Sequence, residues 1–363
     1  MEKSDISRDI SWDIVRCIGI FCVILGHCLP FTHACSFIYQ FHMGLFFFIS
    51  GFFLKVPQNF RLFDFTNFLI RKFKSIYLPF VVVNIIFLIF NTFFYKAHIS
   101  LINYECYDYI KAVVNILFFR TIENPILYPL WFLKSLFVAL VLSFFIVSII
   151  KKKTFALILF VVLYTIGFYF NFYGITIKVI SNRDLIACLL VFLGYMFKIH
   201  KEWIDFIHRY WSIIIIVSFV LLYLGSSFFV IDMKHDSFSY YGVVPIMTII
   251  GVVFCISLSD FILYINIKQQ PLLFIGRYSL YFFIIHTMAF KLVSLFIVWK
   301  YNLSISDNPF FLQDHVVRNE LLYLYWPLYV ISGIIIPSFY IIIKNKLSLL
   351  SRLEIIVAKK ARI

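Results

Sequence analysis

Hydrophobic residues run along the chain in long blocks without a regular polar position, as in 80–90 and 213–224. A helix needs about 17 to 25 such residues to cross a bilayer, whereas the strands of a membrane barrel alternate polar and apolar positions. The pattern therefore predicts an all-α, polytopic membrane helical bundle of about ten transmembrane helices. The expected spans are 14–33, 37–54, 76–94, 130–150, 154–172, 184–198, 211–231, 242–265, 277–298 and 321–343.

The composition indicates a hydrocarbon environment. The 363 residues are 63% hydrophobic, 21% aromatic and 14% charged, whereas soluble domains are about 25% charged. This balance excludes a cytosolic enzyme, a secreted disulfide scaffold and a disordered chain. Most of the seven cysteines lie in apolar blocks, and their spacing indicates neither a disulfide framework nor a metal site. No linker or repeat marks off a soluble unit, so we expect one membrane domain over 1–363, with a basic cytoplasmic tail at 344–363.

Lysine and arginine are distributed unevenly between the two ends of these spans. With the N-terminus inside, 21 of the 32 fall on the cytoplasmic side, eight on the outer side and three within spans. Cytoplasmic loops keep such an excess, so we expect both termini inside and a multi-pass protein of the cytoplasmic (inner) membrane. The net charge of +14 then faces anionic membrane lipid rather than nucleic acid.

Ionisable residues gather on one face of the first span, where each is a functional candidate because charge is costly inside a bilayer. Arg16 and His27 are 11 residues apart, which at about 100° per residue brings them to the same helix face. Asp13 precedes Arg16 by three residues, and we expect the two to form an ion pair. The face then reaches from the cytoplasmic end of the helix to a point beyond the midplane.

Two further histidines lie within predicted spans. His42 falls about five residues below the outer surface, close to the depth expected for His27, and His286 lies nearer the middle of the ninth span. Together the three histidines suggest one cavity. The alternative is that each makes an interhelical hydrogen bond that holds the bundle together.

A basic segment, Arg71-Lys72-Phe73-Lys74, follows the second span on the cytoplasmic side. The positive-inside rule alone accounts for such a cluster. The functional alternative is a clamp for the phosphates of a nucleotide-bearing donor. Two outer loops, about 95–129 and 299–320, carry acidic residues and tyrosines, which suit either a hydroxylated acceptor or ordinary solvated loops.

Five motifs in this order resemble the acyltransferase-3 family of integral membrane acyltransferases and extend over nearly the whole chain. They are Asp13-x-x-Arg16 with His27, Phe41-His42-Met43 with Phe46-Phe47-Phe48-Ile49-Ser50-Gly51, Arg71 to Pro79, Leu130-Trp131-Phe132-Leu133, and Ser279-Leu280-Tyr281 leading to His286. Within the family, the chain looks most like the polysaccharide O-acetyltransferases that include the fucose-4-O-acetylase-like proteins. One departure is that Lys72 and Lys74 stand where the family often has arginine.

The resemblance implies an acyl-CoA-dependent O-acetyltransferase without a metal. It would move an acetyl group from cytoplasmic acetyl-CoA to a hydroxyl of a surface polysaccharide or its lipid-linked precursor. The implied partners are that glycan or lipid-linked sugar, and an oligomer or a polysaccharide-assembly partner is compatible with it. The implied site residues are His27, Arg16 and Asp13 for catalysis and Arg71, Lys74 and Ser50 for acetyl-CoA. His42, His286 and Trp131 are implied as residues that bind substrate or orient, the two histidines acting on either His27 or the acceptor.

Two mechanisms and one rival function stay open at this point. His27 would act either as the general base or as a nucleophile that carries the acetyl group. The rival is a secondary transporter or acyl-group exporter that uses intramembrane Arg16 and His27 as a path for protons or substrate. Many transporters contain inverted repeats, and none is evident in this sequence.

Overall fold

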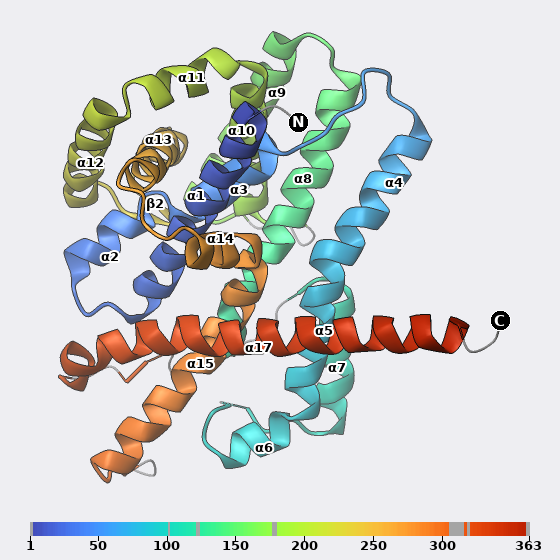
Figure 1. Ribbon diagram of the computed structural model, residues 1–363, viewed down its shortest axis with the longest axis vertical. Helices are drawn as coiled ribbons and strands as arrows, with labels where there is room; N and C mark the ends of the chain where they lie inside the picture. The colour runs from blue at the N-terminus through green and yellow to red at the C-terminus, as the bar shows by residue number, and fades with distance from the viewer. Residues whose placement is uncertain are drawn as a thin grey trace.

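The computed structural model describes residues 3–100, 102–120, 124–175, 180–304, 316–317 and 320–360, and helices make up most of this length (Figure 1). The elements of the first half are α1 (Lys3–Cys28), α2 (Thr32–Tyr39), α3 (His42–Phe52), α4 (Leu62–Lys72), η1 (Phe73–Tyr77), α5 (Leu78–Ile89), α6 (Asn91–Lys96), α7 (Cys106–Leu117), η2 (Pro125–Leu130) and α8 (Trp131–Ile149). Those of the second half are α9 (Lys153–Phe172), α10 (Asn182–Ile199), α11 (Lys201–Arg209), α12 (Trp211–Phe228), β1 (Ile231–Asp232), β2 (Ser237–Phe238), α13 (Val243–Tyr264), α14 (Gln270–Arg277), α15 (Ser279–Lys300) and α17 (Leu321–Lys360). The predicted all-α bundle is confirmed.

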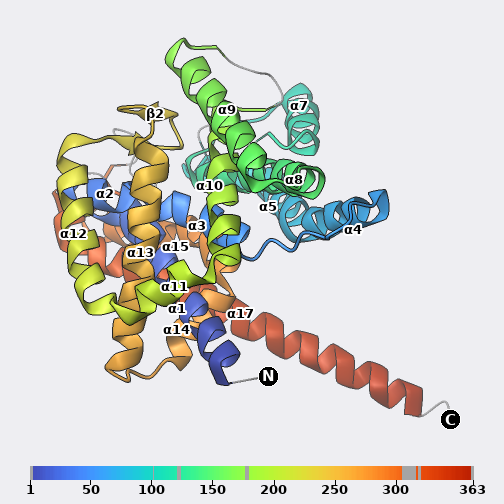
Figure 2. The same cartoon turned by 90° about the horizontal axis from the view of Figure 1, so that it is seen from above.

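Nine helical segments in the described part of the chain are long and apolar enough to cross a membrane. They correspond to nine of the ten predicted spans. The remaining prediction, 184–198, corresponds to α10, an 18-residue helix that carries Arg183, Asp184 and Lys198. This helix packs against α3, α8 and α9 and is buried along most of its length, so it lies inside the bundle (Figure 2).

Helices α3 and α10 approach each other until their backbones touch. A Cβ atom on Gly51 would lie 1.8 Å from the carbonyl oxygen of Val191, and one on Gly194 would lie 1.9 Å from that of Phe48. Only glycine fits at both positions, as is common where membrane helices meet. The contact holds α3, and therefore His42 at its N-terminal end, against the centre of the bundle.

The second predicted span, 37–54, is broken near its start, and its helical part begins earlier, at Thr32. α2 ends at Tyr39 and α3 begins at His42, so Gln40 and Phe41 form a turn within the span. The Gln40 Nε2 amide donates a hydrogen bond of 2.8 Å to the carbonyl oxygen of Phe229. This turn lets His42 begin a helix instead of lying within one.

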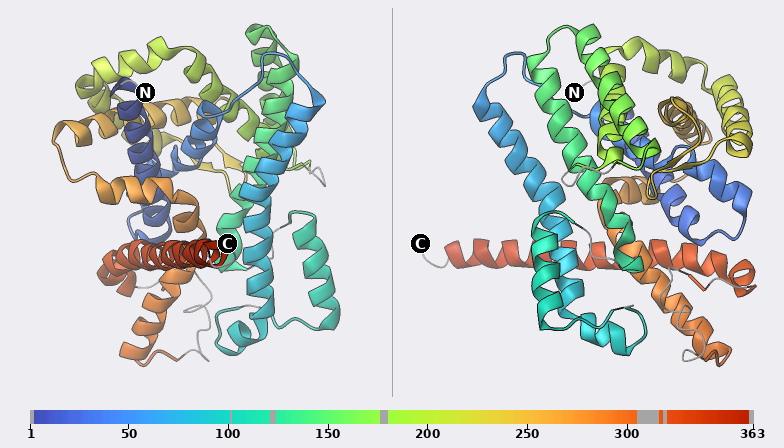
Figure 3. Two further views of the ribbon diagram at one scale, coloured as in Figure 1. Left: turned by 45° about the vertical axis from the view of Figure 1, so that its right-hand side comes forward. Right: turned by 180° about the vertical axis from the view of Figure 1, so that it is seen from behind.

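The third predicted span begins at Leu62 rather than at 76, which corrects the placement of the basic cluster. Residues 62–89 form one uninterrupted helical segment through α4, the π-helical turn η1 and α5 (Figure 3). The stretch 62–70 is apolar enough to extend the helix, so Arg71, Lys72 and Lys74 lie along a helix and not in a loop. π-helical turns often occur at functional sites.

A two-stranded hairpin lies between α12 and α13 in the chain. β1 and β2 pair antiparallel, with Ile231 opposite Phe238 and Asp232 opposite Ser237. The hairpin packs against α2, and Arg183 of α10 binds Asp236 at 2.9 Å. The hairpin is therefore anchored from two sides next to the α2–α3 turn.

The expected separate tail at 344–363 is, as far as Lys360, a continuation of α17. This helix projects from the bundle in Figures 1 and 2. Residues 361–363 and, in the second outer loop, 305–315 and 318–319 lie outside the described residues. α6 and α7 lie between the third and fourth segments that are long enough to cross a membrane, 62–89 and 126–149.

Candidate active site

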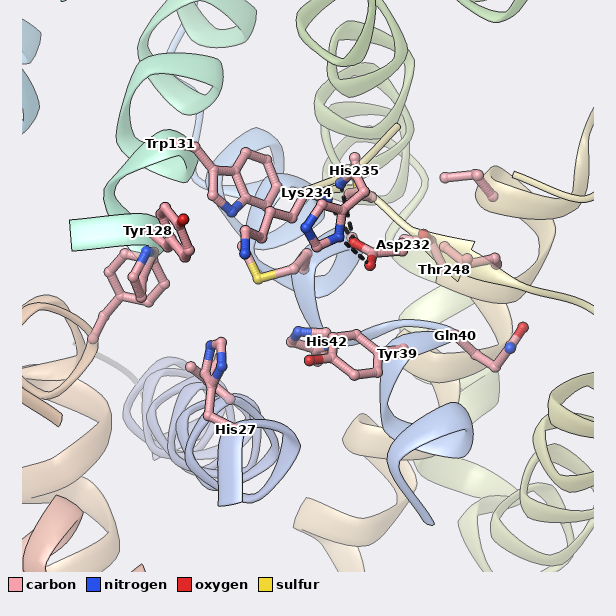
Figure 4. Close-up of a pocket in the computed structure, with 18 residues that line it drawn as sticks. His27, Tyr39, Gln40, His42, Tyr128, Trp131, Asp232, Lys234, His235 and Thr248 are labelled. Carbon is pink, nitrogen blue, oxygen red and sulfur yellow. Dashed lines mark hydrogen bonds and ion pairs between the residues drawn. The ribbon is translucent and has the colours of Figure 1, made fainter. Parts of the chain in front are cut away.

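A cavity of about 300 Å³ lies beside the α2–α3 turn, bounded by α1, α3, η2 and the hairpin. Figure 4 shows the side chains of His27, His42 and Trp131 directed toward one space. The polar and aromatic residues that line this histidine cavity are His27, Tyr39, Gln40, His42, Tyr128, Trp131, Asp232, Lys234, His235, Thr248 and Phe283. The structure thus brings together two of the predicted histidines and the predicted tryptophan.

His42 is held in one orientation by its own helix start. Its Nδ1 lies 3.0 Å from the carbonyl oxygen of Ile38, and its ring packs edge-on against Tyr39, with centroids 4.9 Å apart. A carbonyl oxygen only accepts hydrogen bonds, so Nδ1 carries the hydrogen, and in the neutral imidazole Nε2 then carries the lone pair. His42 therefore presents a hydrogen-bond acceptor to ligands.

His286 was expected to line the same cavity, but its side chain is fully buried and lies behind His27. The centroids of the two imidazole rings are 5.3 Å apart. Nδ1 of His286 donates to the carbonyl oxygens of Phe282 and Phe283, at 3.2 and 2.9 Å. Its Nε2 is buried and has no hydrogen-bond partner among the described residues. His286 is therefore not among the residues that line the histidine cavity, although it lies next to His27.

The residues at 16, 20, 23 and 27 of α1 form one face, which has a cavity at each end. Val23 and His27 line the histidine cavity, and Arg16 and Ile20 line a second cavity of about 280 Å³. This arrangement confirms the prediction that Arg16 and His27 share a helix face. A rise of 1.5 Å per residue separates the two positions by about 16 Å along the helix.

The second cavity combines cationic and hydroxyl side chains, and we call it the arginine cavity. Its polar lining consists of Arg16, Ser50, Lys72, Ser75 and Ser279. Lys72 comes from the basic cluster, whereas Arg71 is exposed and does not line this cavity. Lys74 lines a separate, largely apolar groove together with Lys344. Of the three residues predicted to bind the donor, only Ser50 is at this cavity.

The Asp13 carboxylate binds two arginines. Its Oδ1 accepts from Arg16 Nη1 at 2.8 Å, and its Oδ2 accepts from Arg277 Nε at 2.9 Å. The predicted Asp13–Arg16 pair is therefore present, and sequence reasoning missed Arg277. Backbone contact brings α14 here, because a Cβ atom on Gly276 would lie 1.9 Å from the carbonyl oxygen of Asp13. Arg16 also lies 4.6 Å from the centre of the Phe53 ring.

One aromatic ring belongs to the walls of both cavities. Phe283 of α15 is the one described residue that lines both of them. Its ring packs against Phe132 of α8, with centroids 5.3 Å apart, and is 5% exposed. The ring of Phe283 therefore forms part of the boundary between the arginine cavity and the histidine cavity.

Asp232, Lys234 and His235 of the hairpin also belong to the site, and no motif pointed to them. The Asp232 carboxylate accepts hydrogen bonds from the backbone N–H groups of Lys234 and His235 and lies 2.6 Å from His235 Nδ1. Burial alone would raise the pKa of Asp232, but the hydrogen bonds from His235 and Lys234 outweigh it and leave the pKa below its usual value. Within the described ranges, no group of three His, Cys, Asp or Glu side chains is arranged to hold a metal ion.

The comparisons with known proteins agree with this geometry. The profile of the acyltransferase-3 family, described as an acyltransferase domain, matches residues 9–343. Neither the curated proteins nor the solved structures include a significant match. The matched range covers nearly the whole chain and includes every residue that lines the two cavities. The chain therefore belongs to the acyltransferase-3 family and is a membrane acyltransferase.

Proposed function

We propose that this acyltransferase moves an acetyl group from cytoplasmic acetyl-CoA to a hydroxyl of a surface polysaccharide or its lipid-linked precursor. The observation that carries the proposal is the single face of α1 that joins the arginine cavity at Arg16 to the histidine cavity at His27. Donor and acceptor would enter from opposite ends of this face. The transfer would take place near Phe283, where the cavities meet.

The arginine cavity suits the phosphate-bearing end of CoA. Arg16 and Lys72 offer two positive charges, and no acidic residue is among its lining residues. The guanidinium of Arg16 is kept in place by Asp13 from one side and by Phe53 from another. Charge-assisted hydrogen bonds to phosphate are about twice as strong as neutral ones, so two cations give this cavity a clear preference for an anionic donor.

His27 is the residue best placed for the transfer itself. As general base, it would take the proton of the acceptor hydroxyl while the oxygen attacks the acetyl carbon; the C–S bond breaks, and the proton ends on the CoA thiolate. As nucleophile, it would first form an acyl-imidazole and release CoA, and the acceptor oxygen would then take the acetyl group. Both routes give the acetyl ester and free CoA.

The histidine cavity supplies groups for holding a sugar. His42 offers an acceptor nitrogen, and Trp131 and Tyr128 offer flat aromatic faces. Buried neighbours and a hydrogen bond fix the His42 ring, so it can orient a hydroxyl without first being ordered itself. We assign His42 and Trp131 to the acceptor.

A radiolabel experiment tests the proposal. The protein is reconstituted in lipid nanodiscs with [¹⁴C]acetyl-CoA, with and without an oligosaccharide acceptor, and both CoA release and labelled sugar are measured. We expect acceptor-dependent CoA release and one labelled ester per CoA, and we expect both to be lost in His27→Gln. CoA-independent movement of an acyl compound across proteoliposomes, without ester formation, would instead establish the transporter alternative.

A further inference from the structure

A third cavity, of about 310 Å³, adjoins the histidine cavity and is lined by four cations. These are Arg120, Lys134, Arg183 and Lys234. They come from the end of α7, from α8, from α10 and from the hairpin, which are far apart in the sequence. We call this space the cationic cavity. It shares Tyr128, Trp131 and Lys234 with the histidine cavity, so the two spaces have a common wall.

The acidic partners of these cations lie behind them and do not face the cavity. Asp184 is fully buried, lies 3.8 Å from Lys134 Nζ and accepts a hydrogen bond of 2.5 Å from Ser135. Asp236 binds Arg183 at 2.9 Å. Neither carboxylate is among the residues that line the cavity. Among the described residues, the lining of this cavity therefore contains four cationic side chains and no carboxylate.

Aromatic rings hold two of the cations in the common wall. The Arg183 guanidinium lies 5.2 Å from the centre of the Trp131 ring, and Lys234 Nζ lies 3.9 Å from the centre of the Tyr128 ring. These contacts order both side chains before any ligand binds. Like charges that line one cavity repel one another, and an anionic ligand relieves that repulsion.

We propose that the cationic cavity binds a negatively charged group of the acceptor, a phosphate or a carboxylate, and so restricts the enzyme to anionic sugars. This inference rests on the proposed function, because it assigns the acceptor of the same site. An anionic group in the cationic cavity places the neighbouring sugar ring across the common wall, beside Trp131, with a hydroxyl near His27 and His42. The same charge chemistry is offered by the diphosphate of a lipid-linked sugar and by the carboxylate of an acidic sugar.

The experiment measures acetyl transfer from labelled acetyl-CoA, in nanodiscs, to three disaccharides of one size. One is neutral, one contains a hexuronic acid and one is linked to a polyprenyl diphosphate. The variants are Arg120→Gln, Lys234→Gln and Lys234→Arg, and the matched control is Lys111→Gln, an exposed residue of α7 that does not line the cavity. Binding of inorganic diphosphate and of glucuronate to the same proteins is measured by calorimetry.

We expect a charged acceptor to be preferred, and its KM to rise about tenfold or more in Arg120→Gln and Lys234→Gln, since each substitution removes one charge-assisted hydrogen bond to the anion. The KM for acetyl-CoA and the behaviour of Lys111→Gln should not change, and Lys234→Arg should retain most of the acceptor affinity. The better of the two charged acceptors identifies the source of the anion.

Equal use of the neutral sugar, or an acceptor KM that Arg120→Gln and Lys234→Gln leave unchanged, would overturn the inference. Failure of diphosphate and glucuronate to bind, or binding that falls in Lys72→Gln but not in Arg120→Gln, would also overturn it, because the anion site would then be the arginine cavity. If both probes bind at Arg120 and no sugar is acetylated, the proposed function fails separately, and the cavity is an anion site without a role in transfer.

Discussion

The imidazole rings of His27 and His286 lie with their centroids 5.3 Å apart, one at the cavity surface and the other fully buried. Two backbone carbonyls fix the buried ring, and its Nε2 lacks a hydrogen-bond partner among the residues that the structure describes. Leaving a buried polar atom unpaired costs about 1–3 kcal/mol. A bundle under no other constraint would place an apolar side chain there.

The first prediction therefore concerns His286→Leu. We expect this variant to keep its thermal midpoint or to raise it, because the unpaired nitrogen is removed, while kcat falls about tenfold or more. The measurements are a melting curve in detergent and initial rates of acetyl transfer. A lower melting point with an unchanged rate would show that His286 only supports the bundle. The pH dependence of kcat in His286→Gln gives a second readout, which a purely structural residue would not alter.

The second prediction concerns His27→Ala. Acetyl transfer should fall by about 10²-fold or more, since general acid–base groups contribute about 10²–10⁴-fold. Expression and insertion should be unaffected, because removal of a polar side chain from a span makes insertion easier. The control is His33→Ala, an exposed histidine of α2 outside the histidine cavity. Unchanged transfer in His27→Ala would remove this residue from the mechanism.

The third prediction separates two lysines of the basic cluster. Lys72 lines the arginine cavity and Lys74 lines a groove elsewhere. We expect Lys72→Gln to raise the KM for acetyl-CoA about tenfold, the equivalent of one charge-assisted hydrogen bond, and to make binding less sensitive to salt. Lys74→Gln should change the KM less than twofold. A larger effect from Lys74→Gln than from Lys72→Gln would place the donor phosphates in the groove.

The fourth prediction concerns the shared carboxylate. Asp13→Ala removes the partner of Arg16 and Arg277, whose side chains are 26% and 60% exposed, and should destabilise the fold by about 2 kcal/mol. Arg277→Gln should cost only about 0.5 kcal/mol, because Arg277 is the more exposed partner. Asp13→Asn combined with Arg16→Gln should recover the yield of monodisperse protein but not the activity. Full activity in that double variant would exclude a donor role for Arg16.

The fifth prediction concerns the pH dependence of the hairpin. Because the folded pKa of Asp232 lies below its usual value, its stabilising contribution is present above about pH 4, where the unfolded carboxyl ionises, and is lost as the pH falls through the folded pKa. We therefore measure hydrogen exchange of the backbone amides of 231–238. The part of their protection that depends on the Asp232 carboxylate should stay constant between pH 5 and 8. Asp232→Asn should abolish the extra loss of protection below about pH 4. Identical acid profiles for both proteins would contradict this assignment.

The sequence predicted those features of the fold that depend on local pattern. Apolar block length was enough to locate the spans, and helical periodicity was enough to place Arg16 and His27 on one face. The predicted start of the third span was wrong. Basic residues such as those at 71–74 are typical of a cytoplasmic loop under the positive-inside rule, but here the helix continues through them. No local sequence pattern distinguishes a helix that continues past basic residues at the membrane surface from a helix that ends at them.

The site depends more on contacts between distant segments, which periodicity does not encode. Arg277 reaches Asp13 because Gly276 lets α14 touch α1, and the two residues are 264 positions apart. The hairpin reaches the histidines because Gln40 of the α2–α3 turn binds the backbone at Phe229. Arg120, Arg183 and Lys234 lie far apart in the sequence, and only the packed bundle shows that they line one cavity.

Phe283 has a consequence for the cell that differs from its place in the reaction path. Phe283 is the one described residue that lines both the arginine cavity and the histidine cavity, so its ring is part of the barrier between them. A small side chain at position 283 would thin this barrier and favour leakage of protons along the two cavities. We expect such a substitution to slow growth even in cells that make no acceptor sugar, so bioenergetics as well as chemistry constrains this residue.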